Sequence, residues 1–92
     1  MKRAGGGGRS GREPHRAPAR TLDLRGVGCP LNYVKTRVAL DAVAPGEYVE
    51  VWLDHGEPVE NVPRSCEEDG FPVLVLEEAL GGYVRLVVAR PQ

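Results

Sequence analysis

The sequence has no long hydrophobic run, few aromatic residues and only two cysteines, Cys29 and Cys66. Without about twenty consecutive apolar residues, no transmembrane helix is expected. Two cysteines are too few for a disulfide framework, and no metal-ligand spacing accompanies them. The N-terminus lacks the apolar segment of a secretory signal, so we expect a cytoplasmic protein whose thiols stay reduced.

Chain length and charge indicate which type of binding site and which class of partner to expect. With 92 residues the chain forms one small domain with a modest core, so a surface site is expected rather than a deep pocket. Residues 1–20 contain six basic and one acidic side chain, whereas residues 21–92 contain six basic and twelve acidic ones. An acidic domain is not typical of nucleic-acid binding, so protein partners are expected instead; oligomeric state is left open.

The first twenty residues differ in composition from the rest of the chain. Residues 1–20 contain glycine, proline, small and charged residues without hydrophobic periodicity. Such a segment cannot bury enough apolar surface to offset its chain entropy, which predicts a disordered basic tail. RNA binding by this tail is the weakest interpretation, because a solvated leader has the same composition. The folded domain is therefore expected to span residues 21–92.

From Thr21 onward, strand and helix patterns alternate. Four segments in which apolar and polar residues alternate predict strands at residues 21–25, 47–54, 71–79 and 83–90. One helix is predicted after Pro30, and another from Glu57 to Asp69 that either kinks at Pro63 or starts only near Asn61. The order β-α-β-α-β-β predicts an α/β two-layer sandwich, with a mixed four-stranded sheet and two helices on one face.

The first predicted helix contains an apolar stripe. Leu31, Val34, Val38 and Ala42 recur with helical spacing, which predicts that they form the buried face. Leu40 lies off this stripe, so we expect it to be exposed or to pack against another element. The polar residues between these positions are then expected to face solvent.

Cys29 lies between the turn formed by Gly26 and Gly28 and the helix that follows Pro30. Free amide N–H groups and the positive end of the helix dipole favour a thiolate at such a place. Lys35 and Arg37, one to two turns further on, add a weaker attraction. Cysteine is a poor helix cap compared with Ser, Asp or Asn, which favours a reactive thiol over a small filler residue.

The rest of the sequence does not indicate a second catalytic group that acts together with Cys29. No histidine lies close to Cys29 in the sequence, so a cysteine-protease dyad is not indicated. Cys66 is seven residues from Val59, on the predicted packed face of the second helix, and free cysteines are commonly buried. A secondary, resolving thiol and a Cys29–Cys66 disulfide remain open, because the sequence does not define the geometry of such a bond.

Two segments resemble the TusA/SirA-like family of sulfur carriers: LDLRGVGCPLNYVKTRVALDAVAPGEYVEVWLD (22–54) and VPRSCEEDGF (62–71). In that family, Leu-Asp-x-Arg-Gly-x-x-Cys-Pro-x-Pro precedes a basic helix, Gly-Glu and a strand that ends in aspartate. The second segment is similar to the family's second helix. The resemblance extends from residue 21 to about residue 90 and implies the two-layer sandwich already predicted from the periodicities.

The resemblance implies that Cys29 accepts a terminal sulfur from a donor's persulfide and passes it to an acceptor protein. The donor is often a cysteine desulfurase, and the pathways served are tRNA thiolation, cofactor maturation and sulfur metabolism. The partners are then sulfur-donor and sulfur-acceptor proteins, and no cofactor or metal is implied. The residues expected to support the Cys29 site are Arg25, Gly26, Pro30, Asn32, Lys35 and Arg37.

Two positions depart from the family pattern. Asn32 replaces the second proline of the motif, which restores a backbone N–H and is expected to loosen the loop; Phe71 replaces a histidine. These departures motivate an alternative hypothesis, a non-catalytic interaction or regulatory module with the same fold. Under that hypothesis, replacing Cys29 by serine leaves function intact.

Overall fold

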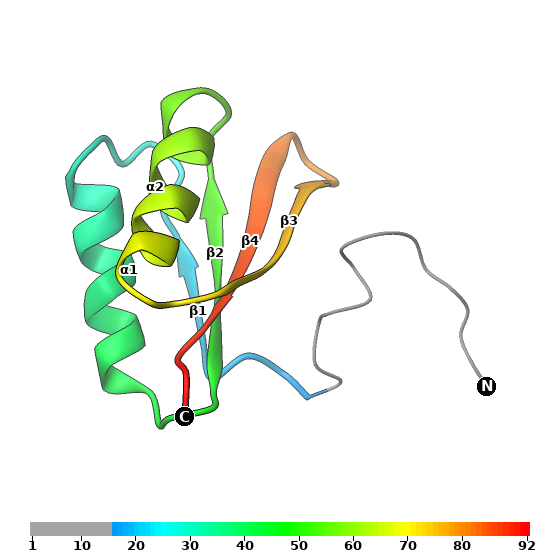
Figure 1. The fold of residues 1–92 in the computed structure, drawn as a ribbon. Helices are drawn as coiled ribbons and strands as arrows, with labels where there is room; N and C mark the ends of the chain where they lie inside the picture. Colours follow the sequence, from blue (N-terminus) through cyan, green and yellow to red (C-terminus); the bar gives the residue numbers. More distant parts are fainter. Residues whose placement is uncertain (1–15) are drawn as a thin grey trace.

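The computed structural model describes residues 16–92, in which two helices cover one face of a four-stranded sheet (Figure 1). In chain order, the elements are β1 (Arg20–Asp23), α1 (Leu31–Ala42), β2 (Tyr48–Leu53), α2 (Glu57–Glu68), β3 (Val73–Ala79) and β4 (Tyr83–Ala89). The predicted two-layer α/β sandwich is confirmed. No helix in the part of the chain described is both long and apolar enough to cross a membrane.

The sheet combines one parallel pair with a hairpin. Its strand order is β1-β2-β4-β3; β1 runs parallel to β2, and the other neighbours are antiparallel. The crossover through α1 makes the parallel pair, because strands joined by a helix run in the same direction. In the hairpin, Gly81 and Gly82 have φ angles of 104° and 83°, which favour glycine. β1 and β3 are therefore the edge strands of this sheet.

The main core lies between the helices and the sheet. Alternate residues of β2, namely Val49, Val51 and Leu53, are fully buried and face the helices. In α2, Val62 and Cys66 are also buried, as predicted. This helix begins at Glu57 and contains Pro63, so the expectation that it starts only near Asn61 is wrong.

The predicted buried face of α1 is wrong. Leu31, Val34 and Val38 are 52%, 47% and 63% exposed. The residues that α1 buries are Asn32, Thr36, Ala39 and Leu40. The helix packs against α2 and β2, which turns this second face inward, and the Thr36 hydroxyl donates to the Asn32 carbonyl oxygen at 2.9 Å. The two faces have the same helical spacing, so periodicity alone could not distinguish them.

The sheet face opposite the helices is partly polar. Arg85 pairs with Glu50 at 3.0 Å and with Glu77 at 2.7 Å, on the neighbouring strands. At the other end of this face, Tyr48 packs in a small buried cluster, and its hydroxyl donates to the backbone carbonyl of Arg16. Residues 16–20, expected to belong to the tail, are thus attached to the sheet. The prediction of disorder for residues 1–15 lies outside the described residues.

Candidate functional site

Cys29 lies on the loop between β1 and α1, and its side chain is exposed. Pro30 is the N-cap residue, and α1 begins at Leu31. The thiol is therefore placed one residue before the helix cap, at the end of the molecule where β1 leads into α1 (Figure 1).

The loop before Cys29 is tied to the end of β2. The Asp54 carboxylate accepts a hydrogen bond of 2.6 Å from the Gly26 N–H. Gly26 has a φ of 83°, so its backbone turns in the left-handed region that favours glycine. The Val27 N–H then donates to the Leu24 carbonyl at 3.1 Å, which closes the turn. Asp54 was not among the predicted site residues, although it is the aspartate at the strand end in the family pattern.

Arg25 anchors the same segment on the open sheet face. Its Nε and Nη2 atoms donate to the two carboxylate oxygens of Asp23 at 2.8 and 2.7 Å, and these bonds lower the pKa of Asp23 to about 2. Its guanidinium carbon lies 5.1 Å from the ring centroid of Trp52 and 5.0 Å from that of Tyr83, which is cation–π geometry. The Arg25 side chain thus links the loop to β2 and β4.

Asn32 fixes the other side of the loop. The residue is only 1% exposed, and its Oδ1 atom accepts from the Tyr33 N–H at 2.7 Å. Its Nδ2 atom donates to the Val27 carbonyl at 3.4 Å, while its backbone N–H donates to the Gly28 carbonyl at 3.0 Å. These hydrogen bonds join the loop to the helix, which argues against the expected loosening of the loop by Asn32.

The first turn of α1 offers few free amides. The N–H groups of Asn32 and Tyr33 are bonded as described, and that of Val34 donates to the Pro30 carbonyl at 3.1 Å. Pro30 has no N–H. Within residues 16–92, the Leu31 N–H is the one first-turn donor without an acceptor. Within the first turn of α1 itself, one free donor and the helix dipole therefore remain.

Arg37, expected to support the Cys29 site, forms contacts within α1 and with the end of α2. It pairs with Asp41 at 3.2 Å and with Asp69 at 3.1 Å, and its guanidinium carbon lies 5.0 Å from the centroid of the Phe71 ring. The Tyr33 hydroxyl donates to the same Asp69 carboxylate. Burial, followed by this bond to Asp69, raises the pKa of Tyr33 to about 12. The positive charge of Arg37 is thus balanced by these two carboxylates.

Cys66 is fully buried in α2, and both cysteines are free. Burial is the largest cause that raises the pKa of the Cys66 thiol to about 12, and Asp69 and Glu67 add to it. The thiol is therefore neutral near pH 7 and out of reach of a large partner.

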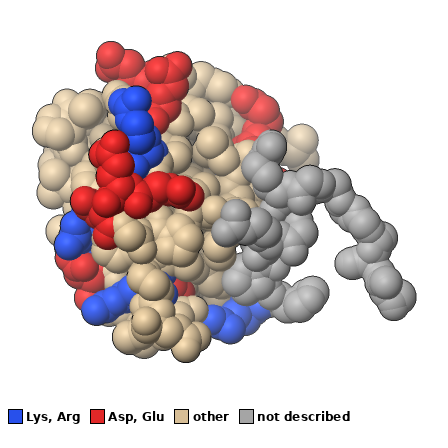
Figure 2. All heavy atoms as spheres, viewed as in Figure 1, with Lys and Arg blue, Asp and Glu red and all other residues tan. Residues whose placement is uncertain are grey.

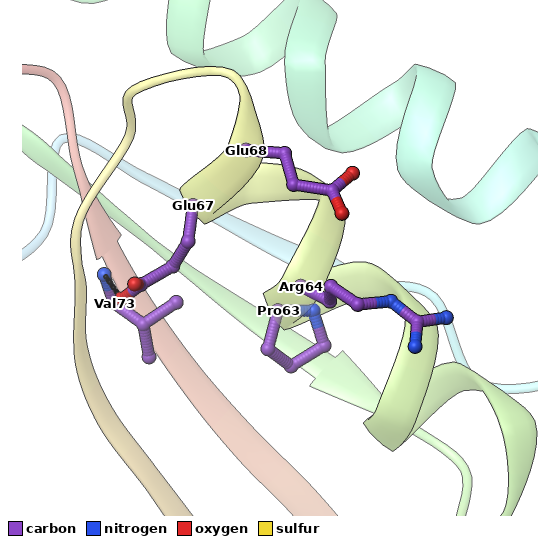
Figure 3. A pocket seen from close by; sticks show the side chains of 5 residues that line it. All are labelled: Pro63, Arg64, Glu67, Glu68 and Val73. Carbon is purple, nitrogen blue, oxygen red and sulfur yellow. Dashed lines mark hydrogen bonds between the residues drawn. The ribbon is translucent and has the colours of Figure 1, made fainter.

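A second place where a ligand or substrate could bind is a hollow of about 520 Å³ between α2 and β3 (Figure 3). Its lining residues are Pro63, Arg64, Glu67, Glu68 and Val73. The Glu67 carboxylate accepts from the Val73 N–H at 3.0 Å and so serves the turn into β3. The lining contains no thiol, hydroxyl or imidazole, and none of the described residues form a group of three or more that could hold a metal.

Comparison with known proteins bears on this fold and site. Residues 20–90 match the family model described as "Sulfurtransferase TusA". A relative from Thermotoga maritima, named "Putative sulfur carrier protein", is 42% identical over 59 residues, which cover 64% of this chain and 75% of the relative. A protein of the same description from Methanocaldococcus jannaschii is 35% identical over 69 residues, covering 75% of this chain and 91% of the relative.

The fold has a counterpart among solved structures. The crystal structure of a SirA-like protein from Desulfitobacterium hafniense superposes with a TM-score of 0.69 at 22% identity, covering 79% of this chain and 99% of that one. At this identity the likeness concerns the fold alone. The family model, in contrast, spans nearly all of the described chain, including the loop that contains Cys29. The chain belongs to the TusA/SirA-like family of sulfur carriers.

Proposed function

We propose that this protein carries sulfur as a persulfide on Cys29. The proposal rests on the contrast between the two thiols of this sulfur-carrier domain. Cys29 is exposed on a loop that hydrogen bonds hold in place, whereas Cys66 is buried. A thiol that must meet sulfur atoms on other proteins needs an open position instead of an enclosed pocket. Cys29 has that position.

The transfer is an exchange at sulfur. The Cys29 thiolate attacks the outer sulfur of a persulfide on the donor protein; the donor's S–S bond breaks, and its electron pair leaves with the donor cysteine as a thiolate. Cys29 then holds the outer sulfur as Cys–S–SH after protonation. In the second step, an acceptor thiolate attacks that outer sulfur and Cys29 leaves as a thiolate. No oxidant or reductant is consumed, because one persulfide replaces another.

The surrounding residues support this role by positioning. Gly26, through Asp54, and Asn32, through Val27 and Tyr33, hold the loop that presents the thiol. A fixed loop lowers the entropy that must be lost when two sulfur atoms align for in-line attack. The function of these residues is therefore to orient Cys29, not to exchange protons with it.

Mass spectrometry tests the proposal directly. After incubation with a cysteine desulfurase and free cysteine, the protein should gain about 32 Da, the mass of one sulfur atom, on the peptide that contains Cys29. The variant Cys29→Ser should gain nothing, and Cys66→Ser, the matched control, should gain sulfur like the parent. Sulfur found on Cys66 alone would contradict the proposal.

The alternative is an interaction module that does not use the thiol. Asn32 and Phe71 suggest it, but both have structural roles: Asn32 is hydrogen-bonded to the loop, and Phe71 is buried under Arg37. These departures from the family pattern therefore do not argue for lost chemistry. In cells lacking the protein, Cys29→Ser should fail to restore function; full restoration would favour the interaction module.

The proposed setting follows from the chemistry of the thiol. A free, exposed cysteine persists in a reducing compartment, so we place the protein in the cytoplasm, between a sulfur-donor protein and a sulfur-acceptor protein. A cysteine desulfurase is the proposed donor. The acceptor belongs to tRNA thiolation, cofactor maturation or sulfur metabolism.

A further inference from the structure

Three large apolar side chains lie on the exposed face of α1. Leu31, Val34 and Val38 lie along the solvent side, whereas Asn32 and Thr36 are buried. Together with β1, this face forms a groove of about 560 Å³. We name it the β1–α1 groove; its lining residues are Arg20, Thr21, Leu22, Asp23, Leu24, Leu31, Val34, Lys35, Val38 and Ala39.

One wall of the β1–α1 groove is an open sheet edge. β1 pairs with β2 on one side only, and among the described residues no strand lies on its other side. Such an edge presents N–H and C=O groups at the spacing of an extended chain, which can add to the sheet as a further strand. The groove therefore fits an extended segment better than a helix or a small molecule.

Among residues 16–92, the groove charges that lack an ion-pair partner are positive, although the domain as a whole is acidic. Arg20 and Lys35 line it, and within residues 16–92 neither forms an ion pair with a carboxylate. The third charged residue, Asp23, already binds Arg25 through both carboxylate oxygens. Over the face seen in Figure 2, acidic side chains are numerous and lie among several basic ones. A segment with acidic side chains thus complements the groove.

We infer that the β1–α1 groove binds an extended segment of the protein that exchanges sulfur with Cys29, with apolar side chains on Leu31, Val34 and Val38 and carboxylates near Arg20 and Lys35. This inference rests on the proposed function for the identity of the partner. Leu31, at one end of the groove, is two residues from Cys29. A segment bound there brings the rest of its protein next to the thiol.

The charges argue against two other occupants. Residues 1–15 contain four basic and one acidic side chain, so this part of the chain has the same sign as the groove. A second copy, related by a two-fold axis through the groove, would bring its own Arg20 and Lys35 against these residues. Both arrangements place like charges together.

A synthetic peptide tests the groove independently of the sulfur chemistry. The probe has about seven residues, an ordinary strand length, in which valine or leucine alternates with glutamate. Its matched control has lysine in place of glutamate. With the full-length Cys29→Ser protein labelled with ¹⁵N, the acidic peptide should shift the amide signals of β1 and of the exposed face of α1, and should bind about tenfold more tightly than the basic one.

Variants of the groove sharpen this test. Val34→Asp should weaken binding of the acidic peptide about tenfold, and Lys35→Glu should reverse the preference between the two peptides. Leu80→Asp is the control, because Leu80 is 97% exposed in the turn between β3 and β4 and lies outside the groove. Equal affinity for both peptides, or shifts outside β1 and α1, would overturn the inference.

A second measurement distinguishes an effect on partner docking in the groove from an effect on the reactivity of the Cys29 thiol. Val34→Asp should react with inorganic polysulfide at Cys29 at the parental rate, yet should raise KM for sulfur transfer from a protein donor about tenfold with little change in kcat. If Cys29 accepts no sulfur from any donor, the proposed function fails, and the peptide titration still decides the groove. If Val34→Asp slows the reaction with polysulfide and the transfer from the protein donor by the same factor, the groove has no docking role.

Discussion

At Cys66, burial links the stability of the fold to pH. The folded state raises the pKa of this thiol from its ordinary value of 9.0 to about 12. Between these values the folded protein binds more protons than the unfolded chain, so the free energy of unfolding must fall as pH rises. The stabilising contribution is complete below pH 9 and is lost as pH approaches 12.

Chemical denaturation at several pH values measures this effect. From pH 9 upward, the free energy of unfolding should fall with a slope that approaches about 1.4 kcal/mol per pH unit from this group. Cys66→Val, which keeps a similar volume without the ionising group, should have a shallower slope. Equal slopes for the parent and Cys66→Val would contradict the prediction.

At Asn32, side-chain hydrogen bonds join the loop to α1 at the position where the family pattern has a second proline. Asn32→Ala removes the acceptor of the Tyr33 N–H and the donor to the Val27 carbonyl, in a buried position. We expect a loss of about 1–3 kcal/mol in stability. Hydrogen exchange should become faster at the amides of the loop between β1 and α1. Unchanged exchange there would show that the amide of Asn32 does not hold the loop.

At the scale of elements, α1 shows what periodicity can and cannot predict. The strand and helix order follows from the periodicity of apolar residues, and Cys29, Pro30 and the family motif indicate the candidate site. The inward face of α1 could not be predicted, because it depends on how the helix is rotated against β2 and α2. Asn32 and Thr36 satisfy their polar groups within the helix and loop, so they can be buried.

Substitution of the two faces of α1 measures their contributions. Leu40→Ala removes a fully buried side chain and should lower stability by about 2–5 kcal/mol. Val38→Ala, on the exposed face, should change it by less than about 0.5 kcal/mol. Thermal unfolding of both variants checks this contrast. A larger loss for Val38→Ala than for Leu40→Ala would contradict the burial seen in the structure.

The contacts of Arg25 connect β1, β2 and β4 in a way that the motif alone did not indicate. The Arg-Gly sequence marks the residue, but its partners Trp52 and Tyr83 come from strands distant in the sequence. Such contacts depend on strand order and register, which no local pattern specifies. Asp23 and Asp54 complete this arrangement from the ends of β1 and β2.

Trp52 is the only tryptophan, so its fluorescence reports on these contacts. Arg25→Met should shift the emission, because the cation is removed from both aromatic rings, and should make the amides of the Cys29 loop exchange faster. Arg25→Lys keeps the charge but loses the two parallel bonds to Asp23, so an intermediate effect is expected. An altered emission with unchanged loop exchange would show that Arg25 does not position the loop.

At the scale of the whole molecule, charge and apolar surface are distributed unevenly. The domain as a whole is acidic, yet the β1–α1 groove is lined by two cations and three exposed apolar side chains. Composition predicted an acidic surface and a protein partner, but it could not locate this groove. Its position depends on two features of the tertiary structure: β1 is an edge strand, and α1 is rotated so that Leu31, Val34 and Val38 face solvent.

Both ends of the described chain meet at Gly46. Arg16 donates to the Gly46 carbonyl at 2.8 Å, the Gly46 N–H donates to the Arg90 carbonyl at 2.8 Å, and the Gln92 side chain lies beside Gly46. This point is at the opposite end of α1 from Cys29 (Figure 1). A second domain fused after residue 92 therefore leaves the thiol accessible.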